Sequence, residues 1–415
     1  MNIFKIFFFL IFKLILISSI LNCNPFQADN DDSETNNRNL LIAAAALSAS
    51  GSSVVVSTLS LSESGKSDSK LILNQPEDLA VDANGIYVAD SKNNRIIKIT
   101  GESTVTSIAT SSGNGGTVTV INNPEGIAIG PNNLIYVANT GASSATSGAY
   151  DGHNIISIDT SNSNTIALLS GANRPTNRET IDGSQGTNRY FKPEGIRYRN
   201  NKLIVGETGG YNVREVTTSS GTVTTLVGEK KTGGASPSGG TPLTSDGTVS
   251  VGTATFNAPK GVVADSSGNI YIVDKGNHCI RKYDPSTNTL STFAGSRLGG
   301  SDNASSGFVD GQGTAAKFNG PYMIDIDTNG NLYVADAGNY AIRKITSAGV
   351  VTTVAGGKGQ GRTDGTATSA QFYNPIGIYY YNNALYVTDV AKASLSTTSD
   401  TSTDYSTIRK ITNVF

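Results

Sequence analysis

The sequence contains no tryptophan, only two cysteines and only two histidines among its 415 residues. The histidines, His153 and His278, are too few for a zinc site that needs several histidine ligands. No Gly-x-Ser-x-Gly nucleophile motif is present. The absence of tryptophan also lowers the expectation of a sugar-stacking site. We therefore predict a protein that is not an enzyme and that needs no metal and no cofactor.

Charge is also scarce, because Asp, Glu, Lys and Arg together make up only 15% of the chain. The 31 Lys and Arg residues nearly balance the 33 Asp and Glu residues, which gives a formal net charge of −2. Binding to nucleic acid requires a basic stripe or patch. We expect no nucleic-acid partner.

The longest apolar run lies in residues 1–22, is interrupted by Lys5 and Lys13, and is followed directly by Cys23. This pattern predicts a bacterial lipoprotein signal peptide over residues 1–22, with Cys23 as the lipidation site. The residues before Cys23 depart from the usual lipoprotein pattern and resemble the relaxed pattern of spirochaete lipoproteins. An uncleaved membrane anchor is the alternative, since the run approaches the ~20 residues that span a bilayer. Both readings place the protein in the cell envelope, held to the membrane at its N-terminus, on the periplasmic side or at the cell surface.

Residues 23–50 are predicted to be a lipidated tether. Residues 24–38 are polar and acidic, as expected of a flexible spacer. Residues 39–50 form a short apolar stretch whose role stays open, either a helix that lies against the next domain or part of the tether.

The rest of the chain, residues 51–415, is organised by a repeat that is clearest between Pro321 and Gly356. Four short apolar or alternating runs, each closed by Gly, Asn, Asp or Ser, predict a four-stranded antiparallel meander. Six copies begin at a proline: Pro76, Pro124, Pro193, Pro259, Pro321 and Pro375. Their second strands end at a polar residue: Asp90, Asn139, Glu207, Asp274, Asp336 and Asp389. Six four-stranded units at this spacing predict an all-β, six-bladed β-propeller.

The fourth copy carries the motif Asn277-His278-Cys279-Ile280-Arg281-Lys282 after Pro259-Lys260-Gly261-Val262. This arrangement resembles the NHL repeat, a known propeller blade. The resemblance implies an NHL-type propeller, a fold that serves as a binding platform and less often as a lyase scaffold. RNA binding, which is known for some NHL domains, is disfavoured by the charge balance.

The sixth copy ends after its third strand, at Ile411. Residues 54–59 have strand character and precede the first copy. We predict that they supply the outermost strand of blade six and close the ring in a Velcro-type arrangement, which removes an open sheet edge.

The long insertions fall in the connections from fourth to first strands and from second to third strands, which emerge on the same face of a propeller. Binding residues tend to lie on such an elaborated face. Tyr and Arg dominate the energetics of interfaces. Insert residues not explained by the repeat are the predicted contacts: Tyr150, Arg174, Arg178, Arg189, Tyr190, Tyr211, Phe308, Tyr340 and Tyr405.

Four of the long connections contain an Asp-Gly pair, and the blades that follow them carry an arginine in the third strand. The aspartates are Asp182, Asp246, Asp310 and Asp364, and the arginines are Arg214, Arg281, Arg343 and Arg409. Blades one and two have isoleucine at the arginine position, Ile97 and Ile156, and lack the Asp-Gly pair. We interpret each pair as a structural clasp between a carboxylate and a guanidinium. Phenylalanines near the proline, Phe191, Phe256, Phe318 and Phe372, are expected to pack between neighbouring blades.

Glu77, Glu125 and Glu194 follow the proline in blades one to three, which predicts an acidic arc at one side of the channel mouth. The glutamates are either solvated turn residues, a cation site, or a general base. We expect a monomeric, non-enzymatic binding or scaffolding module for a protein or other extracytoplasmic ligand. The alternative is an extracytoplasmic lyase or lactonase that uses these carboxylates.

Overall fold

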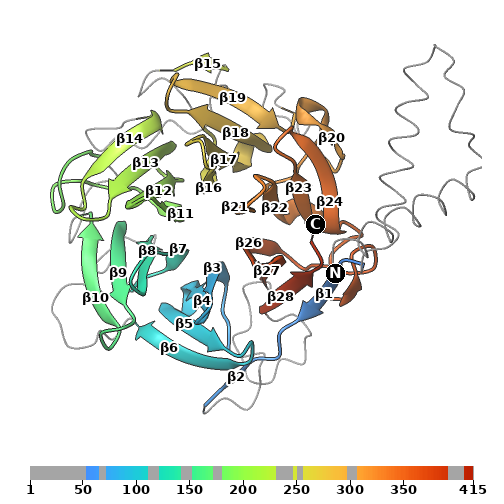
Figure 1. Cartoon of the computed structure of the whole chain (residues 1–415), viewed down its shortest axis with the longest axis horizontal. Coiled ribbons are helices and arrows are strands. Elements are labelled where there is room, and N and C mark those ends of the chain that lie inside the picture. Colours follow the sequence, from blue (N-terminus) through green and yellow to red (C-terminus); the bar gives the residue numbers. More distant parts are fainter. Residues whose placement is uncertain are drawn as a thin grey trace, which may run out of the picture. The chain divides into compact units, whose positions relative to one another are not determined.

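The computed structural model describes residues 53–64, 72–110, 121–141, 152–171, 180–229, 246–249, 256–296, 306–390 and 406–414. These residues form six sheets of mainly antiparallel strands, arranged as the blades of a propeller (Figure 1). The predicted leader (1–22), the predicted tether (23–50) and Cys23 lie outside them. Among the described residues, no helix is long and apolar enough to cross a membrane.

Each blade has four main strands. In blade one they are β3 (Pro76–Asp82), β4 (Gly85–Asp90), β5 (Arg95–Thr100) and β6 (Thr104–Thr110). In blade two they are β7 (Pro124–Ile129), β8 (Leu134–Asn139), β9 (Asn154–Asp159) and β10 (Thr165–Ser170). In blade three they are β11 (Pro193–Arg199), β12 (Lys202–Glu207), β13 (Asn212–Thr217) and β14 (Val223–Gly228).

The other three blades repeat this order. In blade four the strands are β16 (Pro259–Ala264), β17 (Ile270–Asp274), β18 (Cys279–Asp284) and β19 (Thr289–Ala294). In blade five they are β21 (Ile324–Ile326), β22 (Leu332–Asp336), β23 (Ala341–Ile345) and β24 (Val350–Gly356). In blade six they are β26 (Pro375–Tyr381), β27 (Ala384–Asp389), β28 (Thr407–Thr412) and β1 (Val55–Thr58).

Four blades have a short additional strand at the outer edge: β2 (Ser62–Glu63) in blade one, β15 (Gly247–Thr248) in blade four, β20 (Gly311–Gln312) in blade five and β25 (Gly365–Thr366) in blade six. Short 3-10 turns are η2 (Ser91–Asn93), η3 (Lys275–Asn277), η5 (Gly313–Ala315) and η6 (Ala337–Asn339). The strands β15, β20 and β25 lie in the Asp-Gly connections. These connections therefore extend the outer rim of the blade that follows them.

The apolar core is divided among the six interfaces between neighbouring blades. Second strands such as Leu332–Asp336 are buried along their whole length, because a blade covers each face. Fourth strands such as Val350–Gly356 alternate between buried and exposed residues, because they lie near the rim. Each pair of neighbouring blades shares one cluster of buried apolar side chains.

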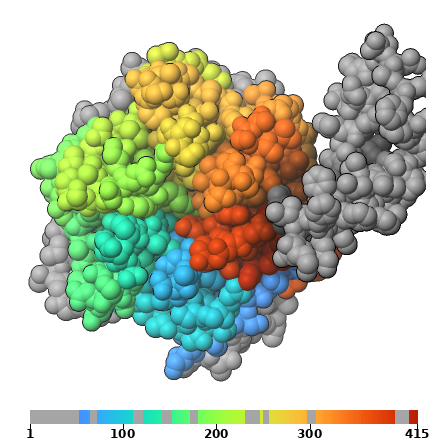
Figure 2. Space-filling view, viewed as in Figure 1, coloured from blue at the N-terminus to red at the C-terminus, as the bar shows by residue number. Residues whose placement is uncertain are grey.

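The ring is closed. The innermost strands contact one another in the cyclic order β3, β7, β11, β16, β21, β26 and again β3. Figure 2 shows the blades as coloured sectors around the middle of the face in view. The fold is a six-bladed propeller, as the repeat predicted.

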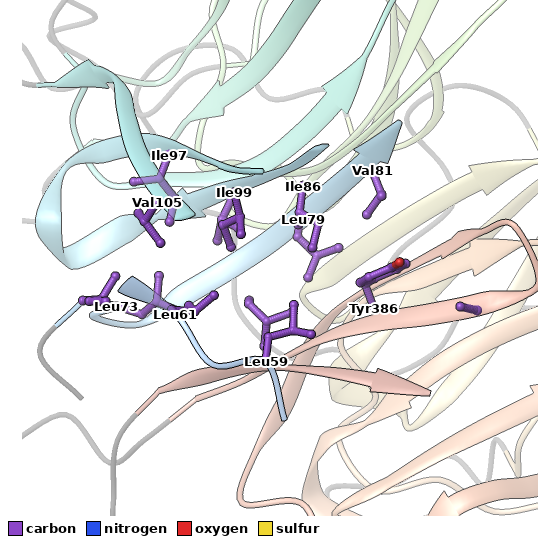
Figure 3. Packing of buried hydrophobic residues seen from close by; sticks show 14 residues of the cluster. Leu59, Leu61, Leu73, Leu79, Val81, Ile86, Ile97, Ile99, Val105 and Tyr386 are labelled. Atoms are coloured by element: carbon purple, nitrogen blue, oxygen red, sulfur yellow. The ribbon is translucent and has the colours of Figure 1, made fainter. Parts of the chain in front are cut away.

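The N-terminal strand β1 pairs antiparallel with β28, with Val56 opposite Ile411 and Thr58 opposite Arg409. After β1, Leu59 and Leu61 enter the apolar cluster between blade six and blade one, where Tyr386 lies beside them (Figure 3). The strand was expected at the outermost position, but β25 lies outside it. Whether the ring needs β1 for its stability stays a prediction.

Candidate functional site

The first strands of blades one to four and of blade six start with a register shift against the second strand. In blade one, Pro76 is paired with Asp90 and Asp78 with Ala89, so Glu77 is an extra residue in the ladder. The same shift makes Glu125 and Glu194 the extra residues in blades two and three. Such a β-bulge re-aims a side chain. The register shift therefore determines where the three glutamates of the predicted arc lie in their strands.

Lysine and tyrosine side chains complete this site, which we call the channel-mouth cluster: Glu77, Glu125, Glu194, Lys260, Lys275 and Tyr322. Lys260 Nζ forms an ion pair with the Glu194 carboxylate and lies 3.9 Å from Glu125 Oε2. It also lies 4.6 Å from the centre of the Tyr322 ring, and Lys275 Nζ lies 4.4 Å from the same ring.

At this mouth, the structure does not show solvated glutamates. Glu194 and Lys260 are only 4% and 6% exposed. Each blade contributes the residue after its first proline, so the glutamates share the ring with Lys260, Tyr322 and Ile376. Lys260 occupies the position next to the predicted acidic arc and pairs with Glu194.

Burial perturbs the titration of this cluster. Burial, followed by repulsion from Glu125, raises the pKa of Glu77 to about 7. Burial lowers the pKa of Lys260 to about 8, against the attraction of Glu125 and Glu77. The pKa of Lys275 is lowered by burial as well. Glu77 Oε2 is buried and has no hydrogen-bond partner among the described residues. The mouth thus holds an acid and a base that both titrate near neutral pH.

Within the described ranges, no group of three or more His, Cys, Asp and Glu side chains is placed to hold a metal ion. The three glutamates do not converge on one point, and Lys260 supplies the positive charge between two of them. The cluster is therefore suited to hydrogen bonds and ion pairs with a polar ligand.

All four predicted Asp–Arg pairs are in contact. The distances from arginine Nη2 to aspartate Oδ1 are 2.9 Å for Arg214–Asp182, 2.9 Å for Arg281–Asp246, 2.7 Å for Arg343–Asp310 and 2.8 Å for Arg409–Asp364. Each arginine is fully buried. A threonine of the fourth strand, Thr225, Thr292, Thr353 or Thr58, donates its hydroxyl to the same aspartate. Each clasp thus joins the connection to the third and fourth strands of its blade.

Blade one has a different clasp, which the sequence pattern did not reveal. Arg95, the first residue of β5, lies 2.7 Å from Asp90 and 2.5 Å from Glu63 of the outer strand β2. Its Nη2 also donates to the Ile72 carbonyl at 2.6 Å. Arg95 stands two positions before Ile97, so a comparison at the usual arginine position misses it.

One predicted surface contact, Tyr190, is wrong, because this side chain is fully buried. Its hydroxyl is 2.9 Å from Ser170 Oγ, and the Arg214 guanidinium lies 4.8 Å from its ring centre. Arg343 and Arg409 lie over Phe318 and Phe372 in the same way. The packing residue of blade three is therefore Tyr190, whereas Phe191 stacks on His153 with ring centres 5.6 Å apart.

The other predicted contacts are placed as follows. Arg189 donates to carbonyls of its own loop, those of Gly186, Thr187 and Asn188. Phe308 is 42% exposed, with Arg343 4.9 Å from its ring centre. Tyr211 and Tyr340 have positive φ angles, 53° and 54°, at the start of the third strand on the face of the long connections. Tyr150, Arg174, Arg178 and Tyr405 lie outside the described residues.

The two histidines link neighbouring blades. His153 Nδ1 accepts the Lys192 N–H at 2.9 Å, and His278 Nδ1 accepts the Gly320 N–H at 2.8 Å. Asn94 takes the same position in blade one, where its Oδ1 accepts the Asn123 N–H at 2.7 Å. Both histidines therefore have a structural hydrogen bond in place of a ligand.

Comparison with known proteins agrees with this geometry. The family described as NHL repeat matches residues 73–99 and 256–283, which lie in blades one and four. The molecule is therefore a six-bladed β-propeller that carries NHL repeats.

Two relatives and one solved structure are informative. NHL repeat-containing protein 2 of Homo sapiens is 28% identical over 301 residues, which cover 66% of this chain and 39% of the relative. SUPPRESSOR OF QUENCHING 1, chloroplastic, of Arabidopsis thaliana is 39% identical over 87 residues, which cover 21% of this chain and 8% of that protein. The chain thus spans less than half the length of these relatives. A crystal structure described as an auxiliary nutrient binding protein of Bacteroides ovatus superposes with a TM-score of 0.55 at 18% identity, over 86% of this chain and 76% of the other. This last likeness is one of fold.

Proposed function

We propose that the protein is a non-enzymatic binding propeller of the cell envelope, which engages a polar ligand or a protein partner at the channel-mouth cluster. The observation that carries this proposal is the burial of Glu194 and Lys260 as an ion pair at the mouth. Burying charge is costly, and perturbed ionisable groups gather at functional sites. The description of a propeller of the same fold as a nutrient-binding protein also supports a binding role.

The position of the cluster favours recognition from the face of the long connections. First strands begin on this face, where Pro76 is opposite Asp90, the last residue of β4. The connections from second to third strands and from fourth to first strands leave from the same side. A partner that reaches Glu77 or Lys275 therefore also meets these connections, where Tyr211, Phe308 and Tyr340 remain candidate contacts.

A lyase or lactonase remains the second candidate. Glu77 and Lys260, with pKa values of about 7 and about 8, have the proton affinities of a general base and a general acid at neutral pH. Binding is the better-supported proposal, because Lys260 is held in an ion pair with Glu194.

The experiment compares three forms of the detergent-extracted, full-length protein: wild type, a mouth variant and a matched control. The mouth variant combines Glu194→Gln with Lys260→Met, and the control combines Lys202→Gln with Glu215→Gln, a surface ion pair of blade three. A partner retained by the wild type and the control but lost from the mouth variant supports the proposal. Equal retention by all three contradicts it. A stoichiometric divalent ion that is lost on Glu125→Gln would favour the enzyme.

Attachment to the envelope is the remaining part of the proposal, with lipid on Cys23 as the anchor and a monomer as the displayed form. Labelling of growing cells with an alkyne fatty acid should mark the wild-type chain and not Cys23→Ser. Equal labelling of both chains would refute lipidation at Cys23. Protease treatment of intact cells then distinguishes the cell surface from the periplasmic side.

A further inference from the structure

A second site lies at the opposite end of the central channel. A cavity of about 290 Å³ is lined where the first strands end, by Ala128 and Ile129 of β7, Tyr198 and Arg199 of β11, and Ile326 of β21, among others. The channel-mouth cluster lies where the same strands begin. The two sites are therefore separated by the length of the inner strands, and the proposed function does not involve this cavity.

The inner side of the cavity is formed by Arg197, which joins several blades. Its Nη1 lies 2.8 Å from Asp78 Oδ2 in blade one, and its Nε lies 3.5 Å from Asp325 Oδ1 in blade five. Its Nη2 donates to the Ile378 carbonyl of blade six at 3.0 Å. Two carboxylates thus share one guanidinium, which leaves an excess of negative charge. Asp78 Oδ1 is fully buried without a hydrogen-bond partner among the described residues, whereas Asp325 Oδ2 accepts the Tyr380 N–H at 2.6 Å.

The outer side of the cavity carries the guanidinium of Arg199 and the carboxylate of Asp265. Arg199 donates from Nη2 to the Ser266 carbonyl at 2.8 Å, and among the described residues it has no carboxylate within ion-pair distance. The carboxylate of Asp265, which also lines the cavity, is occupied by the backbone N–H groups of Ser267 and Asn269 and by the Asn269 amide. Arg199 therefore has guanidinium donors left for a ligand.

Apolar side chains form the wall between the two charged ends. Ile129, Ile204, Ile326 and the ring of Tyr379 line the cavity. The volume corresponds to about ten water molecules at ~30 Å³ each, which is the space of a small organic molecule. A ligand with only a negative charge would be repelled by Asp325, and a ligand with only a positive charge would be repelled by Arg199. A molecule with both charges and an apolar body satisfies both ends.

We propose that this cavity binds a zwitterion of the α-amino-acid class with an apolar side chain. The carboxylate of the ligand binds the guanidinium of Arg199, whose planar geometry suits two parallel hydrogen bonds. The ammonium group lies at Asp325, one of the two carboxylates that share the Arg197 guanidinium. The apolar side chain packs against Ile129, Ile204 and Ile326.

Calorimetric titration of the full-length protein tests this assignment with L-leucine, N-acetyl-L-leucine and L-leucine amide as probes. Leucine carries both charges, and each analogue lacks one of them. We expect leucine to bind and each analogue to bind about tenfold more weakly or less. Arg199→Gln should lower the affinity for leucine by about tenfold and leave the affinity for leucine amide nearly unchanged, because only leucine has the carboxylate. Lys202→Gln, close to Arg199 in sequence, is the control and should change neither.

Three outcomes would overturn the proposal: no binding of leucine or of L-phenylalanine, equal binding of leucine and its analogues, or leucine binding that is unaffected by Arg199→Gln. Arg199 is partly exposed and donates a hydrogen bond to the Ser266 carbonyl at the surface, so this variant is expected to fold. Thermal unfolding of the variant verifies this, and Arg199→Lys, which keeps the charge and loses the fork, should show an intermediate affinity.

Discussion

The backbone N–H and the hydroxyl of Thr58 both donate to the carboxylate of Asp364, at 2.9 and 2.8 Å, across 306 residues of sequence. Thr353 makes the same two hydrogen bonds to Asp310 within blade five, at 3.1 and 3.0 Å. The N-terminal strand therefore reproduces the contacts of a fourth strand that is continuous with its blade.

If β1 stabilises blade six as a fourth strand, Thr58→Val and Thr353→Val should lower the free energy of unfolding by similar amounts, about 1–2 kcal/mol each. Valine keeps the branched shape and removes the hydroxyl donor. Urea denaturation measures both variants. A loss for Thr353→Val with none for Thr58→Val would show that the pairing of β1 contributes nothing.

Removal of residues 51–62 extends this test to the whole strand. The deletion exposes the edge of β28 and removes Leu59 and Leu61 from the cluster between blades six and one. We expect a marked fall in melting temperature, whereas removal of residues 24–38 should leave it unchanged. Equal melting temperatures for the two truncations would contradict a closing role.

Within a clasp, we expect loss of the arginine to destabilise the protein more than loss of the aspartate. Arg343→Met removes the guanidinium that neutralises the buried Asp336 carboxylate and donates to the carbonyls of Val309 and Lys317, which should cost about 3–5 kcal/mol. Asp310→Asn should cost about 1 kcal/mol or less, because the Asp310 side chain is 50% exposed. Chemical denaturation of the two variants gives the comparison. Equal costs would mean that the surface half of the clasp carries the energy.

Glu77 predicts a pH dependence at the channel mouth. Its pKa is raised from 4.5 to about 7, so the native state binds this proton more tightly than the unfolded chain does. The resulting stability is present below about pH 4.5 and is lost as pH rises to about 7. Glu77→Gln stays neutral and should gain about 1–3 kcal/mol over the wild type across this window. Unfolding measured between pH 4.5 and 7 tests this, because Lys260, with a pKa of about 8, stays mostly protonated in that range. Parallel curves for the two proteins would refute the shift.

His278 should be replaceable by asparagine, which takes the equivalent position in blade one. Burial lowers the pKa of His278 below 6.5, so its contribution is complete above pH 6.5 and is lost as the pH falls below it, when Nδ1 gains a proton. His278→Asn keeps an acceptor for Gly320 and should remove this acid sensitivity. His278→Leu should cost about 1–2 kcal/mol at pH 7.5, because it loses the acceptor. If asparagine destabilises as much as leucine, the hydrogen bond to Gly320 is not the reason for the histidine.

The sequence revealed features that recur in several blades, because six copies act as an internal alignment. The Asp-Gly and arginine pairs were found by their joint presence in four blades, and the structure places them in contact. The error at Tyr190 arose because Phe191 matches the other phenylalanines in type but is shifted by one residue. Spacing to the proline would have identified Tyr190 correctly.

Features that occur once were not visible in this way. Arg197 belongs to a single blade, and its partners Asp78 and Asp325 lie more than 100 residues away on either side. The clasp of Arg95 with Glu63 uses a different strand position. The burial of Lys260 and its pairing with Glu194 depend on the register shift at the start of the first strand of blade four. These sites require the three-dimensional register, which a repeat alone does not supply.

The position of Arg197 has a consequence for the synthesis of the chain. Its aspartate in blade one leaves the ribosome before it, whereas Asp325 and the Ile378 carbonyl follow much later. Until those residues emerge, a nascent chain carries a guanidinium that has only part of its final set of partners, and β1 waits for β28. Folding of the blades one after another during synthesis therefore cannot complete the interactions of Arg197 until blade six has emerged. Blade six, the last of the six blades in chain order, completes both the set of partners of Arg197 and the pairing of β1.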